Sequence, residues 1–322
     1  MQRFKKQFAF LFGMIALVTY VSVRYFPSEQ ETTQVIQMED TSTHMQVYLL
    51  DSDQTLVPIS IPVDEEYSTE DKLHLMMGYL SGKQQIKGFY PLFTKETDFS
   101  QIEISGGKAV LHVDDQFTSY DSQLELRILE SIIWGTTQFH DIEQVNLVNK
   151  QGVMTQMPNA STPIPEICNR SIGINHFETG TTSLHNSNEM VVYYAKKVEG
   201  NTYMIPKTKR YASTRTSIES RVNEIIEDIA VSSTLSSPFK KEQVSIQRMD
   251  FQNGVIKVSL DEHILGADKS VKQDVYDSFM LSLLSLSDVK QAQILVDDVV
   301  VSISEHSEPV ALQDITYNVI KF

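Results

Sequence analysis

Two stretches decide the fold, GKAVLHVD at residues 107–114 and GVIKVSLD at residues 254–261. Each alternates apolar and polar side chains, as a strand with one buried face does, and each ends in an aspartate. The likeness continues further along the chain, where DIEQVNL at 141–147 corresponds to DVKQAQI at 288–294. Both pairs are separated by about 147 residues, and a likeness that recurs at one fixed period indicates a duplicated domain.

The hydrophobic pattern around these stretches predicts the same order of elements twice. In the first copy, extended segments lead to a helix that begins near Ser68, followed by a hairpin at Gly106-Gly107, a second helix and a closing strand at 144–148. The second copy repeats this order, with its hairpin turn at Asn253-Gly254. We therefore predict the α+β class: two tandem β(β)αββαβ sandwich domains, each with its helices on one face of a small mixed sheet, behind an N-terminal transmembrane helix.

Changes in composition predict the domain boundaries. Both closing strands are followed by a similar tail, Ile172-Gly173-Ile174-Asn175 in the first copy and Ile315-Thr316-Tyr317-Asn318 in the second. The predicted segments are an N-terminal stub and membrane anchor at 1–27, a flexible spacer at 28–44, a first domain at 45–178, a linker at 179–188 and a second domain at 189–322.

The first residues predict a membrane anchor. Three basic residues precede the apolar run 8–23, and Arg24 with the aromatic pair Tyr25-Phe26 follows it. The excess of positive charge before the run keeps the N-terminus in the cytoplasm and places the rest of the chain outside. A cleaved signal peptide is the alternative, although no small-x-small cleavage site follows the run. We expect a single-pass protein of the cell membrane, with the bulk of the chain extracytoplasmic.

Composition restricts the partners. The formal net charge is −15, and the anchor segment contributes only basic residues, so the remainder is more acidic still. Such a surface repels nucleic acid, because affinity for phosphate comes from Lys and Arg. The single cysteine, Cys168, allows no intramolecular disulfide. A disulfide between chains is the alternative for this thiol, but its place in a predicted connecting segment favours a residue without a specific role.

No motif predicts catalysis, a cofactor or a metal. The eight histidines lack the spacings of a zinc site, and no nucleophile motif or phosphate-binding glycine loop is present. The acidic pairs Asp114-Asp115 and Asp261-Glu262 sit at equivalent strand ends, where capping of the next helix is the favoured role. We therefore predict that the protein is not an enzyme. A triad dispersed along the chain stays open as an alternative, because triads are recognised by geometry.

Two segments are candidates for binding a partner. The only dense basic stretch comprises Lys207, Lys209, Arg210, Arg215 and Arg221, which would suit an acidic neighbouring subunit. A solvated face that offsets local acidic charge is the alternative. The segment FYPLF at 89–93 is expected to fold back as core, with an exposed aromatic patch as the alternative.

Several residues resemble the GerMN domain family of sporulation and germination proteins. The first copy has the family's strand and following Phe in VLHVDDQF at 110–117, its helix end in GTTQF at 135–139 and its closing strand in VNL at 145–147. The second copy departs from this pattern, with LSDV at 286–289 in place of the Thr-Thr-Gln-Phe run. The resemblance covers about 45–322. All of the matching residues belong to strands, helices and turns of the fold, and none forms a catalytic motif.

The resemblance implies a noncatalytic envelope protein that scaffolds or tethers an extracytoplasmic complex in sporulation or spore germination. Its partners would be envelope or sporulation membrane proteins, or further copies of itself. The alternative is an exported cell-wall ligand-binding protein or hydrolase with its site at the junction of the repeats. The alternative predicts a deep polar pocket at that junction, whereas a scaffold predicts exposed sheet edges or helix faces.

Overall fold

The computed structural model describes residues 44–175, 187–214, 216–227, 235, 237, 239, 244–267, 269–301 and 308–320. The predicted anchor, almost all of the predicted spacer, most of the predicted linker and Arg215 lie outside these residues. Within the described residues, no helix is both long and apolar enough to cross a membrane. The described repeats belong to one compact unit, Thr33–Phe322.

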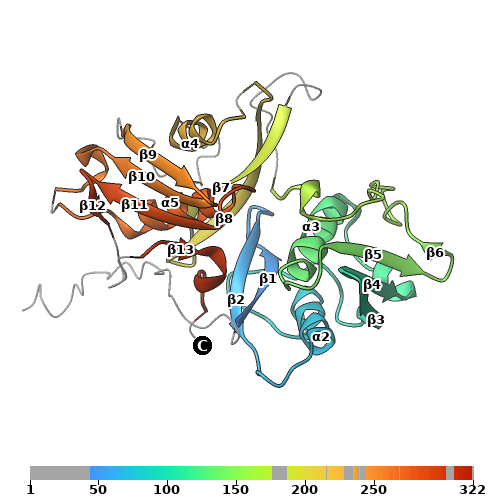
Figure 1. The fold of residues 1–322 in the computed structure, drawn as a ribbon. Helices are drawn as coiled ribbons and strands as arrows, with labels where there is room; N and C mark the ends of the chain where they lie inside the picture. Colours follow the sequence, from blue (N-terminus) through green and yellow to red (C-terminus); the bar gives the residue numbers. More distant parts are fainter. Residues whose placement is uncertain are drawn as a thin grey trace, which may run out of the picture. The chain divides into compact units, whose positions relative to one another are not determined.

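The first repeat contains two separate sheets (Figure 1). Its first two strands, β1 (His44–Leu50) and β2 (Leu56–Pro62), form an antiparallel hairpin. The second sheet has the order β3-β4-β5-β6, in which β4 and β5 are parallel and the other pairs antiparallel. The bounds of the remaining elements are α2 (Thr69–Leu80), β3 (Phe99–Ser105), β4 (Lys108–Val113), α3 (Glu125–Thr136), β5 (Gln144–Asn149) and β6 (Gly152–Val153).

The second repeat has the same topology with one short strand added. Its hairpin pairs β7 (Ser187–Val198) with β8 (Asn201–Ala212), and its mixed sheet has the order β12-β11-β10-β9, with β13 also paired to β11. The strands β10 and β11 are parallel, as β4 and β5 are. The other elements are α4 (Ile218–Glu227), β9 (Ile246–Gln252), β10 (Val255–Leu260), α5 (Gln273–Leu284), β11 (Gln291–Val296), β12 (Val299–Val300) and β13 (Val310–Ala311). The duplication inferred from sequence therefore extends to strand order and direction.

The layering differs from the single sheet per domain that the sequence predicts. In the first repeat, α2 contacts both β1 and β3, and α3 contacts both β1 and β5, so these helices lie between the hairpin and the mixed sheet. Every residue of α3 except Leu126 is buried. A helix that is buried around its whole circumference needs cover on more than one side, which a single sheet does not provide.

The second helix of each repeat, α3 or α5, holds its hairpin by the same hydrogen bond. The Ser131 hydroxyl in α3 donates to the Tyr48 carbonyl in β1 at 2.8 Å. At the equivalent place, the Ser278 hydroxyl in α5 donates to the Tyr193 carbonyl in β7. All four residues are buried, so these hydrogen bonds satisfy polar groups that water does not reach.

Local sequence signals form as expected. Ser68 and Asp71 make a capping box at the start of α2, in which Ser68 Oγ accepts from the Asp71 N–H at 3.1 Å. At the β9–β10 turn, Asn253 and Gly254 have φ values of 53° and 84°, the left-handed conformation that a tight hairpin requires. Asp114 and Asp261 accept from backbone N–H groups of the short 3₁₀ turns that follow them, which confirms the predicted capping role.

Glu125 fastens the tail of the first repeat to α3. Its carboxylate accepts hydrogen bonds from the N–H groups of Asn159 (2.6 Å), Ala160 (2.7 Å) and Thr162 (3.0 Å), and from the Tyr120 hydroxyl (2.8 Å). Burial opposes ionisation of Glu125, but these donors outweigh it and lower the carboxyl pKa to about 2. The segment after β6 is therefore an ordered part of the first domain.

The low pKa of Glu125 predicts a dependence of stability on pH. Its contribution is complete above the pKa of the unfolded chain, near 4.5, and is lost as the pH falls towards the folded value of about 2. Substitution Glu125→Gln should lower the free energy of unfolding at pH 7 and flatten its decline between pH 4.5 and 2. Urea unfolding at a series of pH values measures both. An unchanged slope in the variant would contradict this role for the carboxylate.

Candidate functional site

The two repeats meet through their hairpins, where β2 of the first contacts β8 of the second. Each tail crosses to the hairpin of the other repeat. The Thr208 N–H in β8 donates to the Ile174 carbonyl of the first tail at 2.8 Å, and the Ser60 N–H in β2 donates to the Asn318 carbonyl of the second tail at 3.1 Å. The domains therefore exchange main-chain hydrogen bonds in both directions.

Asn175 of the first tail bridges the two hairpins with its side chain. Its Oδ1 accepts from the Leu56 N–H in β2 at 2.9 Å. Its Nδ2 donates to the Leu56 carbonyl at 2.7 Å and to the Pro206 carbonyl in β8 at 2.9 Å. One buried amide thus satisfies polar groups of both repeats.

Asn318 makes the mirror-related set of contacts. Its Oδ1 accepts from the Met204 N–H in β8 at 2.7 Å, and its Nδ2 donates to the Met204 carbonyl at 2.8 Å and to the Pro58 carbonyl in β2 at 2.7 Å. We call Asn175 and Asn318 with these contacts the asparagine clamp. The two amides relate the repeats by an approximate twofold exchange of roles.

The local sequence explains why asparagine occupies both positions. Asn175 and Asn318 have φ values of 51° and 56°, in the left-handed region that asparagine adopts more readily than most side chains do. Each clamp also meets a strand of the form apolar-x-Pro, Leu56 to Pro58 in β2 and Met204 to Pro206 in β8. Proline donates no ladder hydrogen bond and favours a strand edge. Here the carbonyls of Pro58 and Pro206 themselves accept from the clamp amides.

A buried ion pair also crosses the junction. Lys196 in β7 is 5% exposed, and its ammonium pairs with the carboxylate of Asp51 and lies 2.9 Å from that of Asp53. Both acids belong to the β1–β2 turn of the first repeat. This ion pair favours one orientation of the second repeat relative to the first, because a buried ammonium without its carboxylate partner costs free energy.

Aromatic and amide groups continue the junction on one side. The Tyr193 and Tyr317 hydroxyls are 3.1 Å apart, and the Tyr48 hydroxyl donates to Gln46 Oε1 at 2.9 Å. Burial raises the pKa of Tyr48 and Tyr193, and the charge of Arg170 acts in the opposite direction on both. Arg170 of the first tail therefore lies near tyrosines of both repeats.

A pocket of about 610 Å³ opens beside these tyrosines. We call it the junction pocket, because both repeats line it. Its lining residues are His44, Met45, Gln46, Tyr48, Ser60, Lys72, Thr137, Gln138, Phe139, His140 and Arg170 from the first repeat, and Tyr193, Leu312, Gln313, Ile315, Thr316 and Tyr317 from the second. Its place is the one that the ligand-binding alternative predicts.

The predicted basic stretch does not form one exposed cluster in the described residues. Lys207 and Arg221 are buried, and Arg221 pairs with Asp288. Arg210 pairs with Glu189, and Lys209 is half-buried. Arg215 lies outside the described residues. Docking of an acidic partner on this stretch stays a prediction, and the positions of Lys207 and Arg221 give those two side chains internal roles.

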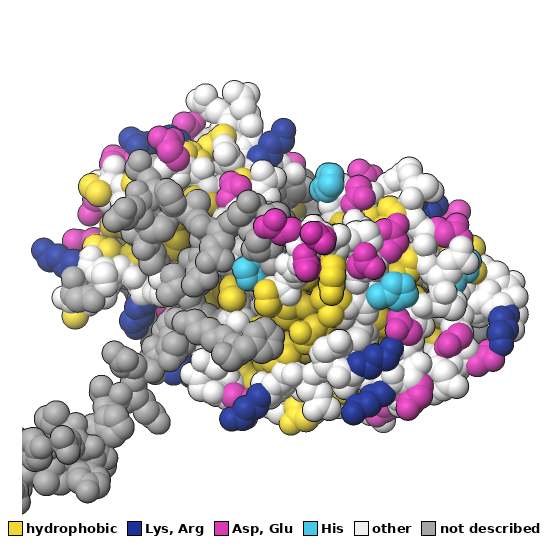
Figure 2. Space-filling view, turned by 90° about the horizontal axis from the view of Figure 1, so that it is seen from below, with side chains coloured by type: hydrophobic (Ala, Val, Ile, Leu, Met, Phe, Trp, Pro, Cys, Tyr) yellow, Lys and Arg dark blue, Asp and Glu magenta, His cyan; other side chains and the backbone are white. Residues whose placement is uncertain are grey.

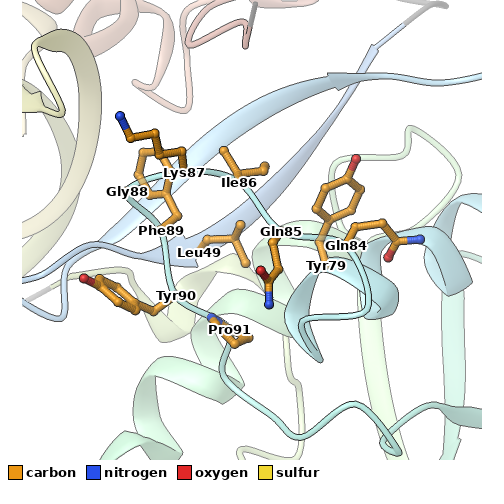
Figure 3. A pocket seen from close by; sticks show the side chains of 10 residues that line it. All are labelled: Leu49, Tyr79, Gln84, Gln85, Ile86, Lys87, Gly88, Phe89, Tyr90 and Pro91. Atoms are coloured by element: carbon orange, nitrogen blue, oxygen red, sulfur yellow. The ribbon is translucent and has the colours of Figure 1, made fainter. Parts of the chain in front are cut away.

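The aromatic segment 89–93 packs mainly as core, as expected. Phe89, Leu92 and Phe93 are buried, and Tyr90 is exposed. Figure 3 shows residues 84–91 as a loop beside Leu49 of β1, lining a second pocket of about 500 Å³. Figure 2 shows hydrophobic side chains gathered near the middle of one face, with acidic and basic side chains distributed around them.

Other candidate groups stay apart. Among the described residues no cluster of His, Cys, Asp and Glu is suited to hold a metal ion. Cys168 is buried, and burial raises its thiol pKa to about 11, which disfavours the open alternative of a disulfide between chains. His112 approaches Glu103 on the mixed sheet at 3.1 Å and is not among the residues that line the junction pocket.

Sequence reasoning found one part of the junction and missed the rest. The matching tails, each ending in asparagine, indicate that Asn175 and Asn318 are equivalent. Nothing in the local sequence indicates that their side chains bridge the two repeats. Lys196 and Arg170 carried no local signal, because their partners are distant in sequence. Alignment of the two repeats offers one clue. Asp51 follows Tyr48 by three residues, and Lys196, of opposite charge, follows the equivalent Tyr193 by three residues.

Comparison with known proteins gives concordant results. The family model described as "Germane: Sporulation and spore germination" matches residues 46–149 and 191–302. The chain is 24% identical over 277 residues to the spore germination protein GerM of Bacillus subtilis strain 168, covering 84% of this chain and 76% of that protein. It is similar to the solved structure of the tandem GerMN domains of the sporulation protein GerM from Bacillus subtilis, with a TM-score of 0.74, 25% identity, and coverage of 83% of this chain and 96% of that one.

The asparagine clamp can be tested by alanine substitution. Asn175→Ala and Asn318→Ala should each lower the free energy of unfolding by about 1–3 kcal/mol, because buried backbone groups on both repeats lose their partners. Asn253→Ala is the matched control, since it removes an asparagine with a similar φ from a hairpin turn away from the junction. Urea unfolding measures the three variants. Equal losses in clamp and control variants would show that only backbone conformation matters.

The ion pair predicts a stability loss that a second substitution partly restores. Lys196→Met should cost about 3–5 kcal/mol, because it leaves the buried Asp51 without its counter-charge. Addition of Asp51→Asn removes that charge while keeping an oxygen for the turn N–H groups of Asp53 and Thr55. Urea unfolding at pH 7 should therefore find the double variant more stable than Lys196→Met alone. The reverse order would refute a coupled pair.

Proposed function

Because this chain belongs to the Germane family of sporulation and spore germination proteins, we propose that it is a noncatalytic envelope protein that scaffolds or tethers an extracytoplasmic complex. The observation that supports this most directly is the set of buried hydrogen bonds that joins two equivalent modules. Their exchanged tails and the asparagine clamp make the described repeats one body rather than two loosely linked domains. A body of this kind is suited to holding partners at set positions.

Each repeat offers an equivalent sheet edge to a partner. The strands β3 and β9 are the terminal strands of their mixed sheets, so one side of each forms no ladder with another described strand. Their exposed residues include Gln101 and Glu103 in β3 and Arg248 in β9. Charged side chains on an edge strand deter indiscriminate pairing. A specific partner strand, or the edge of another copy, is able to add to the sheet there.

We further propose that the apolar segment 8–23 anchors this body as a single transmembrane helix with its N-terminus in the cytoplasm. The polar residues 28–44 would then hold the repeats away from the bilayer. The partners would be envelope or sporulation membrane proteins, or further copies of this chain. The descriptions of the relatives as sporulation and germination proteins agree with this context.

Site-specific photocrosslinking tests the proposal. A photoreactive amino acid replaces Gln101 on β3 or Arg248 on β9 of the full-length protein in intact cells, and Tyr67, an exposed loop residue, serves as the control position. We expect adducts with a membrane protein of the envelope, or a ladder of self-adducts, at an edge position and not at Tyr67. Membrane-localised protein without adducts at either edge would refute scaffolding through these strands.

A further inference from the structure

The junction pocket differs in charge from the rest of the chain. The protein has 42 Asp and Glu against 27 Lys and Arg, but none of the described residues that line this pocket is acidic. Its charged lining residues are Lys72 in α2 and Arg170 in the first tail, and His44 and His140 add two imidazoles. A concave site of one sign concentrates ligands of the opposite sign, even on a protein whose net charge repels them.

The described residues provide no carboxylate partner for either cation. Neither Lys72 nor Arg170 forms an ion pair there, whereas Lys83, Lys150, Lys196, Arg127, Arg210, Arg221 and Arg248 each do. Lys72 and Arg170 are also only half-buried, and both line the pocket. Both are therefore available to an anion that enters from solution.

Arg170 is held in place before any ligand arrives. Its guanidinium carbon lies 4.7 Å from the centre of the Trp134 ring. Its Nε donates to Thr137 Oγ1 at 3.0 Å and one Nη to the Trp134 carbonyl at 3.3 Å. These two hydrogen bonds use two of the five N–H donors of the guanidinium and leave the others for an oxyanion. A prearranged planar donor loses little entropy when it binds a carboxylate or phosphate.

The remaining lining suits the organic part of a small ligand. Gln46, Gln313 and Thr316 contribute amide and hydroxyl groups, and Phe139 and Leu312 contribute apolar surface. The volume of about 610 Å³ lies within the usual range for small-molecule sites, which often occur where two domains meet. The site therefore matches a compact polar molecule better than a bare inorganic ion.

We propose that the junction pocket binds a small organic acid, whose oxyanion group contacts Arg170 and Lys72 and whose body lies against both repeats. The oxyanion is a carboxylate or a phosphate, since both accept from a guanidinium and an ammonium. A ligand in this place contacts both halves of the molecule and stabilises their association by mass action. This binding role is independent of scaffolding, because the sheet edges β3 and β9 lie outside the pocket lining.

Isothermal titration of the full-length protein in detergent tests the proposal with matched pairs of probes. N-acetylmuramic acid is compared with N-acetylglucosamine, acetyl-Ala-Ala acid with its amide, and glucose 6-phosphate with glucose. We expect at least one acid to bind and its neutral counterpart not to bind. The pair that shows the difference identifies a sugar acid, a peptide carboxylate or a sugar phosphate as the source of the oxyanion.

Variants then locate the binding. Lys72→Gln and Arg170→Gln should each lower the affinity for the acid about tenfold or more, because each removes a charged donor. Lys95→Gln, an exposed lysine outside the pocket, should leave affinity unchanged. Gln313→Trp should block the pocket without a change of charge. Arg170 also contacts Trp134, so Arg170→Gln can fail to fold. In that case Lys72→Gln and Gln313→Trp decide the matter.

The proposal is overturned if none of the three acids binds, or if the acids bind equally to wild type, Lys72→Gln and Gln313→Trp. It is also overturned if Lys95→Gln weakens binding as much as Lys72→Gln does, because that result would indicate general attraction to positive charge. Crosslinking at β3 and β9 would be unaffected by any of these outcomes, so the two proposals fail separately.

Discussion

Two buried asparagine side chains determine how the halves of this protein are joined. Each amide satisfies both backbone groups of one residue in its own repeat and the carbonyl of a proline in the other. The carbonyls of Pro58 and Pro206 need partners because the junction excludes water from them. The cost of an unsatisfied buried group thus fixes the register between β2 and β8, and the tails that carry the asparagines must cross from one repeat to the other.

The remaining junction contacts depend on that register. Lys196 reaches Asp51 and Asp53 only when β7 lies beside the β1–β2 turn, and Tyr193 meets Tyr317 in the same arrangement. The opposite charges at Lys196 and Asp51 also break the approximate symmetry. A second copy of the same repeat in either place would bring like charges together, which disfavours pairing of identical repeats. The clamp therefore specifies the register between the hairpins, and the ion pair specifies which repeat pairs with which.

Much of the fold was predictable from sequence because it depends on local patterns. Alternation at 107–114 and 254–261, the Asn253-Gly254 turn and the Ser68 cap each report on neighbouring residues, and the structure confirms them. The number of sheets was not predictable, because the burial of α3 on all sides depends on where β1 and β2 lie. Likewise Arg170 and Lys196 meet partners that hydrophobic periodicity does not locate. The residues that line the junction pocket come from seven segments that are separated in sequence, so no single motif predicts the pocket.

The asparagine clamp makes the two repeats one rigid body. Measurement of a distance between the two repeats tests this rigidity most directly. Spin labels at Gln101 in β3 and Lys257 in β10, in a Cys168→Ser background, report that distance by pulsed electron paramagnetic resonance. We predict a single narrow distribution that broadens when Asn175 and Asn318 are both replaced by alanine. A broad distribution in the protein with both asparagines intact would contradict the account.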